Sequence, residues 1–494
     1  AYAHMNRGIV YWYQGDLEQA LRDYDRAAKL SPNDPLVFNN RGVALHDAGK
    51  LDQALADYNR ALELNPKYAE VYNNRGNVYG DKGDSDRAIA DYNRALELNP
   101  KYAEAYNNRG LDLVRKGELD RALADYNRAL ELNPQYAAAY GNRAEVYYKQ
   151  GDSARAQADR KRAQELNPKD GFAYFRSGYA HAEKEAWDLA IADYTRGLEL
   201  KPQDAAAYLN RGYAYHRKGD WNRAIADFSR TLELNPKEAH AYLNRGQAYN
   251  RKGDCDLAIA DFTRVLELNP KDAEAYHNRG YVYGRKRDWD QAILDFNRAL
   301  ELNPKDALAH FSRGFAYAHK DDWDRAIADY TRGLEFNPKD AKAYYYRGTA
   351  YLQKGDWDRA IADDTRALEL NPKYTEACVA RGEAYGKKPD FGRALADFNR
   401  ALELDPQSAK AYVGRGIIFD SKKDGDRALA DYRRALEIDP KSARAYYREA
   451  LVLEKSGKGK EALEAYRGFL KYAASQEKKG RLLHALERIE ALEQ

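Results

Sequence analysis

The sequence predicts an all-α protein: a solenoid of fourteen repeats, each a pair of helices joined by a short turn. Apolar and small residues recur with the spacing of a helix face rather than with strand alternation. Internal repetition at a fixed period of 20–50 residues is typical of solenoids. Only Pro35 and Pro389 lie outside a strict series of prolines 34 residues apart, at 32, 66, 100, 134, 168, 202, 236, 270, 304, 338, 372, 406 and 440. Fourteen repeats of 34 account for residues 1–476.

Each repeat divides into two predicted helices, with positions numbered 1–34 from residue 1. Apolar or small residues at positions 3, 4, 8, 10 and 11 predict the first helix, over positions 1–14. Position 15 is often glycine, as expected just after a helix end, and position 16 is often aspartate, which can cap the next helix. Positions 18–30, such as DRAIADYNRALEL at 86–98, predict the second helix, which Asn-Pro ends.

The two ends of the solenoid differ. Stacked repeats need polar caps, and we expect a capping helix at 477–494. Its apolar stripe consists of Leu482, Leu483, Leu486, Ile489 and Leu492. The chain begins at position 1 of a repeat, and IVYWY at 9–13 is strongly apolar. We therefore expect either further residues upstream or contact of this end with a partner or a second copy of the chain.

The composition argues against several classes of protein. Basic and acidic residues nearly cancel, 81 against 78, so no strong field favours nucleic acid or an anionic membrane. A mean hydropathy of −0.87 is too polar for a membrane protein. Two distant cysteines, Cys255 and Cys378, argue against a disulfide framework or a cysteine metal cluster. We expect a soluble protein, with the cytoplasm favoured, that binds neither nucleic acid nor membrane.

Catalytic motifs are missing from the sequence. It contains no Walker loop, no dinucleotide fingerprint after a strand and no HExxH. The nine histidines do not cluster with carboxylates at metal-ligand spacing. We therefore expect no enzyme activity, no metal and no cofactor.

The repeat resembles the tetratricopeptide repeat (TPR) family along nearly the whole chain. Repeat 3 carries all of the characteristic residues: Tyr72, Gly76, Tyr79, Ala88, Tyr92, Ala95 and Pro100. The resemblance implies a right-handed superhelix in which first helices line the concave face and second helices the convex face. It also implies a protein-interaction role.

Position 7 departs from the family, which usually has a large apolar residue there. Position 23 is aspartate in thirteen repeats, and antiparallel helices would bring it within reach of position 7, in the same repeat or a neighbouring one. We expect a half-buried ion-pair ladder; the alternative is a set of arginines that serves a ligand. Where Asp364 replaces the usual tyrosine at position 24, the following repeat offers Arg381, which suggests that position 24 of one repeat lies near position 7 of the next. Position 7 is arginine in twelve repeats: Arg7, Arg41, Arg75, Arg109, Arg143, Arg211, Arg245, Arg279, Arg313, Arg347, Arg381 and Arg415.

Asparagine at position 6 forms a ladder on the expected concave face. It resembles the ladder of the O-GlcNAc transferase superhelix, where such asparagines hold a peptide backbone. An amide donates and accepts, so it suits an extended main chain of any sequence. The alternative is inheritance from an ancestral repeat. The candidate peptide-binding residues are Asn40, Asn74, Asn108, Asn142, Asn210, Asn244 and Asn278, after Asn6 in repeat 1.

Two further rows favour a groove across repeats 6–10. Apolar groups beside cations suit an extended peptide with hydrophobic and acidic side chains. The alternative for the charges is a solvated helix rim, and tryptophans at position 17 are expected to pack. The apolar candidates, at positions 5 and 9, are Phe175, Tyr179, Leu209, Tyr213, Leu243, Tyr281, Phe311, Phe315 and Tyr345. The basic candidates, at position 13, are Arg115, Lys149, Arg217, Arg251 and Arg285.

The sequence thus predicts a non-enzymatic scaffold that binds protein segments along its concave face. A second hypothesis is a regulatory or substrate-recruiting arm of a larger enzyme, because bacterial chains join such repeats to glycosyltransferase or caspase-like protease domains. A third is a self-assembling structural protein that associates through its N-terminal end.

Overall fold

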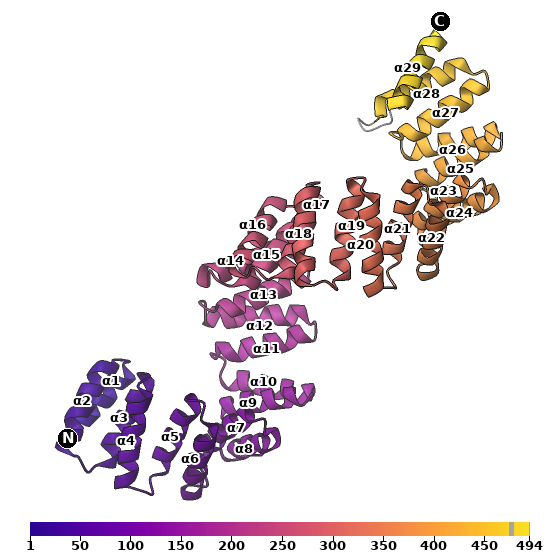
Figure 1. The fold of residues 1–494 in the computed structure, drawn as a ribbon. Coiled ribbons are helices and arrows are strands. Elements are labelled where there is room, and N and C mark those ends of the chain that lie inside the picture. The colour runs from indigo at the N-terminus through magenta and orange to yellow at the C-terminus, as the bar shows by residue number, and fades with distance from the viewer. Residues whose placement is uncertain (474–478, 494) are drawn as a thin grey trace. The chain divides into compact units, whose positions relative to one another are not determined.

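A computed structural model describes residues 1–473 and 479–493, and within these ranges the chain is entirely helical apart from its turns. The described residues form 29 α-helices and no strand, which confirms the all-α prediction (Figure 1). The chain divides into two compact units, Ala1–Pro236 and Lys237–Gln494, here called the N-terminal and C-terminal units. The predicted boundary between residues 476 and 477 lies outside the described residues.

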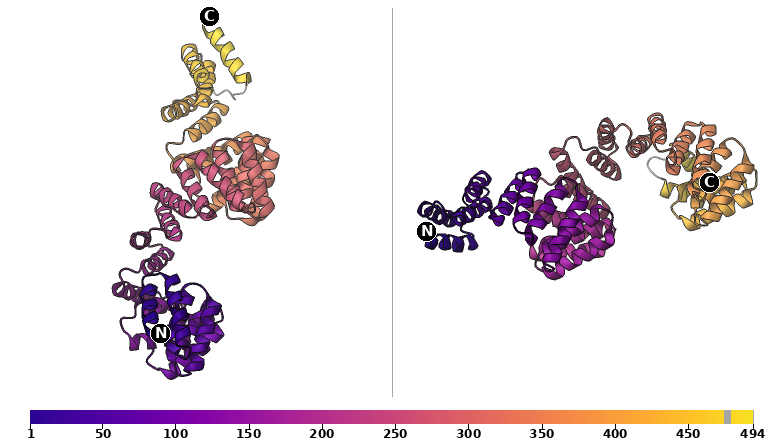
Figure 2. Two further views of the ribbon diagram at one scale, coloured as in Figure 1. Left: turned by 90° about the vertical axis from the view of Figure 1, so that its left-hand side faces the viewer. Right: turned by 90° about the horizontal axis from the view of Figure 1, so that it is seen from below.

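Both units are stacks of helix pairs, and each pair corresponds to one 34-residue repeat (Figure 2). The N-terminal unit contains α1 (Tyr2–Tyr13), α2 (Leu17–Leu30), α3 (Pro35–Asp47), α4 (Leu51–Leu64), α5 (Ala69–Asp81), α6 (Ser85–Leu98), α7 (Ala103–Arg115), α8 (Leu119–Leu132), α9 (Ala137–Lys149), α10 (Ser153–Leu166), α11 (Gly171–Glu183), α12 (Trp187–Leu200), α13 (Ala205–Arg217) and α14 (Trp221–Leu234).

The C-terminal unit repeats this arrangement and adds one helix. Its elements are α15 (Ala239–Lys252), α16 (Cys255–Leu268), α17 (Ala273–Arg285), α18 (Trp289–Leu302), α19 (Ala307–His319), α20 (Trp323–Phe336), α21 (Ala341–Lys354), α22 (Trp357–Leu370), α23 (Thr375–Lys387), α24 (Phe391–Leu404), α25 (Ala409–Ser421), α26 (Gly425–Ile438), α27 (Ala443–Lys455), α28 (Gly459–Tyr472) and α29 (Lys479–Glu493).

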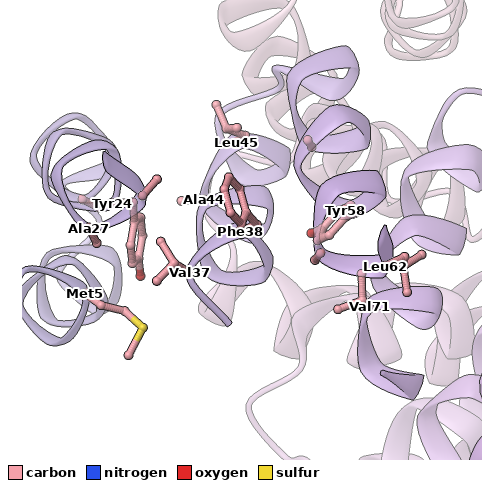
Figure 3. Close-up of a cluster of buried hydrophobic side chains, with 14 of the residues drawn as sticks. Met5, Tyr24, Ala27, Val37, Phe38, Ala44, Leu45, Tyr58, Leu62 and Val71 are labelled. Atoms are coloured by element: carbon pink, nitrogen blue, oxygen red, sulfur yellow. The ribbon is translucent and has the colours of Figure 1, made fainter. Parts of the chain in front are cut away.

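An aromatic ring at position 24 fills the space between the two helices of most repeats. In repeat 3, a Cβ built on Gly76 would fall 2.7 Å from Cε1 of Tyr92, so only glycine lets the helices approach this closely. Figure 3 shows the cluster at the N-terminal end, where Met5 of α1 and Val37 of α3 lie next to the ring of Tyr24 of α2. Each second helix therefore packs against the first helix of its own repeat and of the next.

The turn between the two helices has the predicted glycine after the first helix and the predicted aspartate cap on the second. Gly83 has a φ of +77°, a left-handed conformation that ends the first helix at little cost. The Asp84 carboxylate then accepts a hydrogen bond from the backbone N–H of Arg87 and caps the second helix. In repeats without this glycine another residue has a positive φ, as does Glu185 with a φ of 56°.

The position 7 arginines form the predicted ion-pair ladder, and each pairs within its own repeat. In all twelve repeats Nε and Nη2 donate to the two carboxylate oxygens of the aspartate 16 residues later, at 2.6–2.9 Å. The remaining Nη1 commonly reaches position 25 of the preceding repeat, as Arg75 reaches Asn59 at 2.7 Å. The alternative of free arginines that serve a ligand is therefore not needed.

Asp364 lies close enough to Arg381 for the guanidinium charge to act on its pKa, as expected, but the two form no ion pair among the described residues. Arg381 donates to Asp397 and to Thr365, one residue beyond Asp364. Asp364 is fully buried, and neither of its carboxylate oxygens has a hydrogen-bond partner among the described residues. The aspartate instead takes the place of the aromatic ring at position 24 and lies against Gly348.

The C-terminal helix packs on the last repeat with only part of its predicted stripe. Leu482, Ile489 and Leu492 contact the core, and Ala485, which the prediction omitted, is fully buried there. Leu483 and Leu486 are about half exposed, so they do not belong to the buried face. The buried face of α29 is therefore narrower than predicted, and the residue at its centre is a small one, Ala485.

Candidate functional site

The first helices, α1 to α27 in odd numbers, carry every candidate residue, and their common surface within each unit is called the first-helix surface. In the N-terminal unit, asparagines on this surface hydrogen-bond from repeat to repeat. Asn74 Nδ2 donates to Asn39 Oδ1 at 3.1 Å, and Asn108 Nδ2 donates to Asn73 Oδ1 at 3.2 Å. Asn142 Nδ2 continues the series to the next asparagine at position 5, Asn107, at 2.9 Å. These amide groups therefore join adjacent repeats.

The other ladder residues are placed differently. Asn40 is half-buried on α3, and Asn210 lines a cavity described below. Asn244 donates to the His240 carbonyl of its own helix at 2.9 Å, and Asn278 makes a long contact of 3.5 Å to Glu274. The ladder is thus one continuous hydrogen-bonded series only in repeats 2–5.

The position 5 residues are half-buried between helices and are not the exposed aromatics that we expected. Phe175 and Phe311 insert toward position 27 of their own repeats, where a Cβ on Gly197 or Gly333 would fall 2.2 Å from the ring. Most repeats have a larger residue than glycine at position 27. The joint occurrence of Phe at position 5 and Gly at position 27 therefore indicates in the sequence that this ring packs between the helices. Leu209 and Leu243 pack against buried core residues, and Tyr345 packs against Tyr374.

The position 9 residues Tyr179, Tyr213, Tyr281 and Phe315 are exposed on the first-helix surface, between 37% and 52%. They line two separate cavities, one in each unit. Tyr281 and Phe315 line the larger, of about 500 Å³, called the C-terminal cavity. Tyr179 and Tyr213 line a smaller one of about 400 Å³, called the N-terminal cavity.

Three consecutive first helices, α17, α19 and α21, enclose the C-terminal cavity, and Trp289 and Phe296 of α18 complete it. Aromatic rings form most of the wall. Phe315 contacts Trp289 edge to face with ring centroids 6.2 Å apart, and it contacts Tyr346 in the same way at 5.5 Å. The exposed Leu308 adds a branched apolar side chain to the rim. The cavity is a concave apolar surface open to solvent.

The charged groups at this cavity are cations. Arg285 and Lys342 both line it, and Arg285 Nη1 donates to the carbonyl and the side chain of Asn250. The Lys342 ammonium group has no ion-pair partner within the described part of the chain. His319 stacks on Trp289 at 4.3 Å, and its burial lowers the pKa of the imidazole, which favours the neutral ring. The cavity therefore combines apolar walls with positive charge.

The remaining position 13 residues do not form a continuous row. Arg115 donates to the Gly80 carbonyl and to Asp112, so its guanidinium is occupied within its own unit. Lys149 and Arg251 are exposed. Arg217 bonds Tyr213 and Glu185 beside the N-terminal cavity.

Several lining residues were not among the candidates, notably Trp289, Lys342 and Tyr346 in the C-terminal cavity and Tyr194 in the N-terminal one. Tryptophan at position 17 was assigned to packing. A signal is present in the sequence, because all four repeats with an exposed aromatic residue at position 9 also carry this tryptophan: Trp187, Trp221, Trp289 and Trp323.

No group of three or more His, Cys, Asp or Glu side chains in the described part of the chain could hold a metal ion. Among the helices described, none is both long and apolar enough to cross a membrane.

Family models match the sequence along most of its length. The model described as "TPR repeat" matches residues 8–49, 44–83, 110–151 and 178–219. Models described as "Tetratricopeptide repeat" match residues 69–102, 137–170, 209–273, 273–306, 296–328, 317–375, 379–443 and 426–479. No curated protein gives a significant match to the sequence.

Solved structures are similar over parts of the chain. YrrB, described as a TPR protein with an unusual peptide-binding site, is 27% identical with a TM-score of 0.33, over 37% of this chain and 95% of that one. MamA is 30% identical with a TM-score of 0.32, over 33% and 95%. A tetratricopeptide repeat protein from Parabacteroides merdae is 22% identical with a TM-score of 0.42, over 50% and 98%. Because these TM-scores lie below 0.5, the family assignment depends on the sequence models.

The matched segments agree with the helix pairs. The matches at 69–102, 137–170 and 273–306 each span one repeat from position 1 to position 34. Each of them contains one complete pair: α5 with α6, α9 with α10, and α17 with α18. The chain belongs to the tetratricopeptide repeat family and has the architecture of a protein-interaction scaffold.

Proposed function

We propose that the chain is a non-enzymatic scaffold that binds an extended protein segment on the first-helix surface, with an anchor side chain in the C-terminal cavity. The observation that carries the proposal is that cavity itself: about 500 Å³, lined by Tyr281, Phe311 and Phe315 and flanked by Arg285 and Lys342. Its size is within the range of small-ligand sites, and the sequence had already indicated four of these five residues.

The walls favour an aromatic or large aliphatic anchor. Phe315 and Trp289 both line the cavity and meet edge to face, and a further ring packed against them gains about 0.5–1.5 kcal/mol beyond the area that it buries. Leu308 and Tyr281 are more than half exposed, so an anchor would cover apolar surface that now faces water.

The rim favours acidic neighbours of the anchor. Arg285 and Lys342 lie on either side of the apolar walls, on α17 and α21, two repeats apart. Carboxylates before and after the anchor in an extended segment would pair with them. Exposed pairs of this kind are screened by salt, so affinity should fall as ionic strength rises.

Selection from a phage library of random twelve-residue peptides on the immobilised full chain tests the proposal. Enriched peptides should share an aromatic or large aliphatic residue with acidic neighbours. Their affinity, measured by fluorescence anisotropy, should fall at least about tenfold for Phe315→Ala, because hot-spot truncations commonly cost more than about 2 kcal/mol. Arg285→Gln should weaken binding less and flatten its salt dependence.

Leu111→Ala is the matched control, because Leu111 occupies position 9 of repeat 4 and is exposed to the same 37% as Phe315. It should leave binding unchanged. A selection that enriches no peptide, or enriches peptides that bind Phe315→Ala as tightly as wild type, would overturn the proposal. Circular dichroism of each variant confirms that the helices are intact.

A further inference from the structure

The N-terminal cavity occupies the same repeat positions as the C-terminal cavity but has different chemistry. Its walls are equivalent: Tyr179 corresponds to Tyr281 at position 9, and Trp187 to Trp289 at position 17. Trp187 and Tyr213 meet edge to face with ring centroids 6.1 Å apart, and their counterparts Trp289 and Phe315 do so at 6.2 Å. The aromatic frame is therefore shared, and the remaining lining residues determine how the two sites differ.

The floor of the N-terminal cavity is polar. Position 24 is Tyr194, where the C-terminal cavity has Phe296. Tyr194 is 1% exposed, and its hydroxyl is buried with no hydrogen-bond partner among the described residues. A buried hydroxyl without a partner is costly, so a ligand atom that hydrogen-bonds to it gains more than it would at an exposed site.

The rim of the N-terminal cavity is acidic. Position 13 is Glu183, where the C-terminal cavity has Arg285, and Glu185 follows in the turn. Glu183 has no ion-pair partner in the described ranges. Burial, followed by the nearby Tyr179, Asp193 and Glu183, raises the pKa of Tyr194, which places the Glu183 charge close to the floor hydroxyl. The Tyr194 hydroxyl therefore stays protonated, and its oxygen can accept a hydrogen bond.

The protein's own Arg217 shows how a cation is held at this wall. Its guanidinium carbon lies 4.8 Å from the Trp187 ring centroid, while Nη2 donates to Glu185 at 3.0 Å and Nη1 to the Tyr213 hydroxyl at 3.1 Å. Aromatic faces beside carboxylates are the usual surroundings of a bound guanidinium or ammonium group. Arg217 neutralises Glu185, so among the described residues that line this cavity Glu183 is the carboxylate without an ion-pair partner.

We propose that the N-terminal cavity binds a basic side chain, arginine or lysine, of a partner segment. The aliphatic part would lie against Tyr179 and Tyr213, and the cation would pair with Glu183 while one N–H donates to the Tyr194 hydroxyl oxygen. The C-terminal cavity, with Phe296 and Arg285 at the equivalent positions, has the opposite preference. The two cavities thus share one set of aromatic walls but bind two different kinds of side chain, basic in the N-terminal unit and apolar with acidic neighbours in the C-terminal unit.

This inference rests on the proposed function, because it assigns to the N-terminal unit the same kind of peptide recognition. The two are separable by experiment, since each cavity lies within one unit and has its own probe. If the basic probes do not bind the N-terminal cavity while peptides still bind the C-terminal cavity, only this inference is contradicted and the proposed function stands.

Saturation-transfer NMR on the full chain tests the inference, with Nα-acetyl-arginine amide and Nα-acetyl-lysine amide as probes. Nα-acetyl-citrulline amide, a neutral analogue of nearly the same shape, is the control ligand. The basic probes should bind the wild type in the millimolar range and citrulline should not. Tyr194→Phe should weaken the arginine probe about tenfold, because it removes a hydrogen bond to a charged group. Glu183→Arg should abolish binding.

Both variants are compatible with the fold, because Phe228, Phe262 and Phe296 occupy position 24 in other repeats and arginine occupies position 13 in several. Phe315→Ala, in the other unit, should leave the arginine probe unaffected. The inference is overturned if neither basic probe binds the wild type, if citrulline binds equally well, or if Tyr194→Phe and Glu183→Arg both bind the arginine probe as the wild type does.

Discussion

Arg75 and Asp91 form a two-pronged ion pair inside one repeat, with Nε and Nη2 donating to the two carboxylate oxygens at 2.7 Å each. The Asp91 carboxylate is buried and the Arg75 side chain is only 20% exposed. The third nitrogen donates to Asn59 of the preceding repeat at 2.7 Å. One guanidinium thereby joins the two helices of its own repeat and links that repeat to its neighbour.

Arg75→Met should destabilise repeat 3 by about 3–5 kcal/mol, because it leaves Asp91 buried without its partner. In a solenoid the effect is local, so hydrogen exchange should rise in α5 and α6 before it rises elsewhere. The double variant Arg75→Met with Asp91→Leu should recover most of the loss, since it removes the uncompensated charge.

Arg94→Met is the control, because Arg94 makes an exposed contact with Glu97 three residues away, at 2.7 Å. Exposed pairs of this kind contribute less than about 1 kcal/mol. Equal loss of protection in the two single variants would show that the buried ladder has no special weight in stability.

Asn108→Ala should loosen the contact between repeats 3 and 4. Asn108 Nδ2 donates to both Asn73 at 3.2 Å and Asn77 at 3.0 Å, and Asn73 is buried. The expected cost is about 1–3 kcal/mol, because the substitution leaves a buried amide oxygen without its donor. Asn278→Ala should cost much less, since within the described structure the Asn278 amide makes only the 3.5 Å contact inside its own helix. Urea unfolding of the two variants, followed by circular dichroism, measures the difference.

The features that follow from position within one repeat could be read from the sequence. The proline series placed the helix ends, and the joint occurrence of arginine and aspartate, lost together at Glu449 and Ala465, predicted the ladder. Neighbours in adjacent repeats were harder to predict, because they depend on how each first helix is rotated against the next. The sequence shows Asn73 beside Asn74, but not that Asn74 bonds Asn39 while Asn73 is buried.

The cavities illustrate the same limit. Aromatic residues at position 9 were predicted, as were Phe311 at position 5 and Arg285 at position 13, yet other enclosing side chains come from positions 2, 6, 17 and 24 of neighbouring helices. Whether Tyr194 has a partner for its hydroxyl depends on packing that the repeat pattern does not encode, since Tyr92 at the same position bonds Asn77.

Gly76→Ala should destabilise repeat 3 by about 1–3 kcal/mol, because the new methyl group would overlap the buried ring of Tyr92. Gly392→Ala in the first turn of α24 has its nearest neighbour 3.9 Å away, so it should stabilise by up to about 1 kcal/mol through helix propensity. Opposite shifts in thermal midpoint are expected. Shifts of the same sign would contradict the role of glycine as the site of close helix approach.

Asp364 offers a stabilising substitution. It is fully buried at the position where most repeats have Tyr or Phe, and its carboxylate lies against Gly348 without a hydrogen-bond partner in the described structure. Asp364→Tyr restores the usual ring over glycine and removes a buried acid. We expect a gain of about 1–2 kcal/mol, the range of cavity-filling substitutions, visible as reduced hydrogen exchange in α21 and α22. Faster exchange in these helices would show that repeat 11 has adapted to the aspartate.

Asp364 also predicts a pH dependence. Burial, and next the charge of Asp363, raises the pKa of Asp364 well above its usual range, because the ionised form is poorly solvated there. Below the unfolded-state pKa of about 4, Asp364 is protonated in both the folded and the unfolded protein, and its contribution to stability is fully present. As the pH rises from there toward the raised folded-state pKa, the unfolded state is favoured by ionisation and this contribution is lost. Asp364→Asn mimics the protonated acid, so it should equal wild type in stability near pH 4 and exceed it increasingly up to pH 8. Thermal unfolding of both proteins across this range measures the difference, and a constant difference would mean that the pKa of Asp364 is the same in the folded and unfolded states.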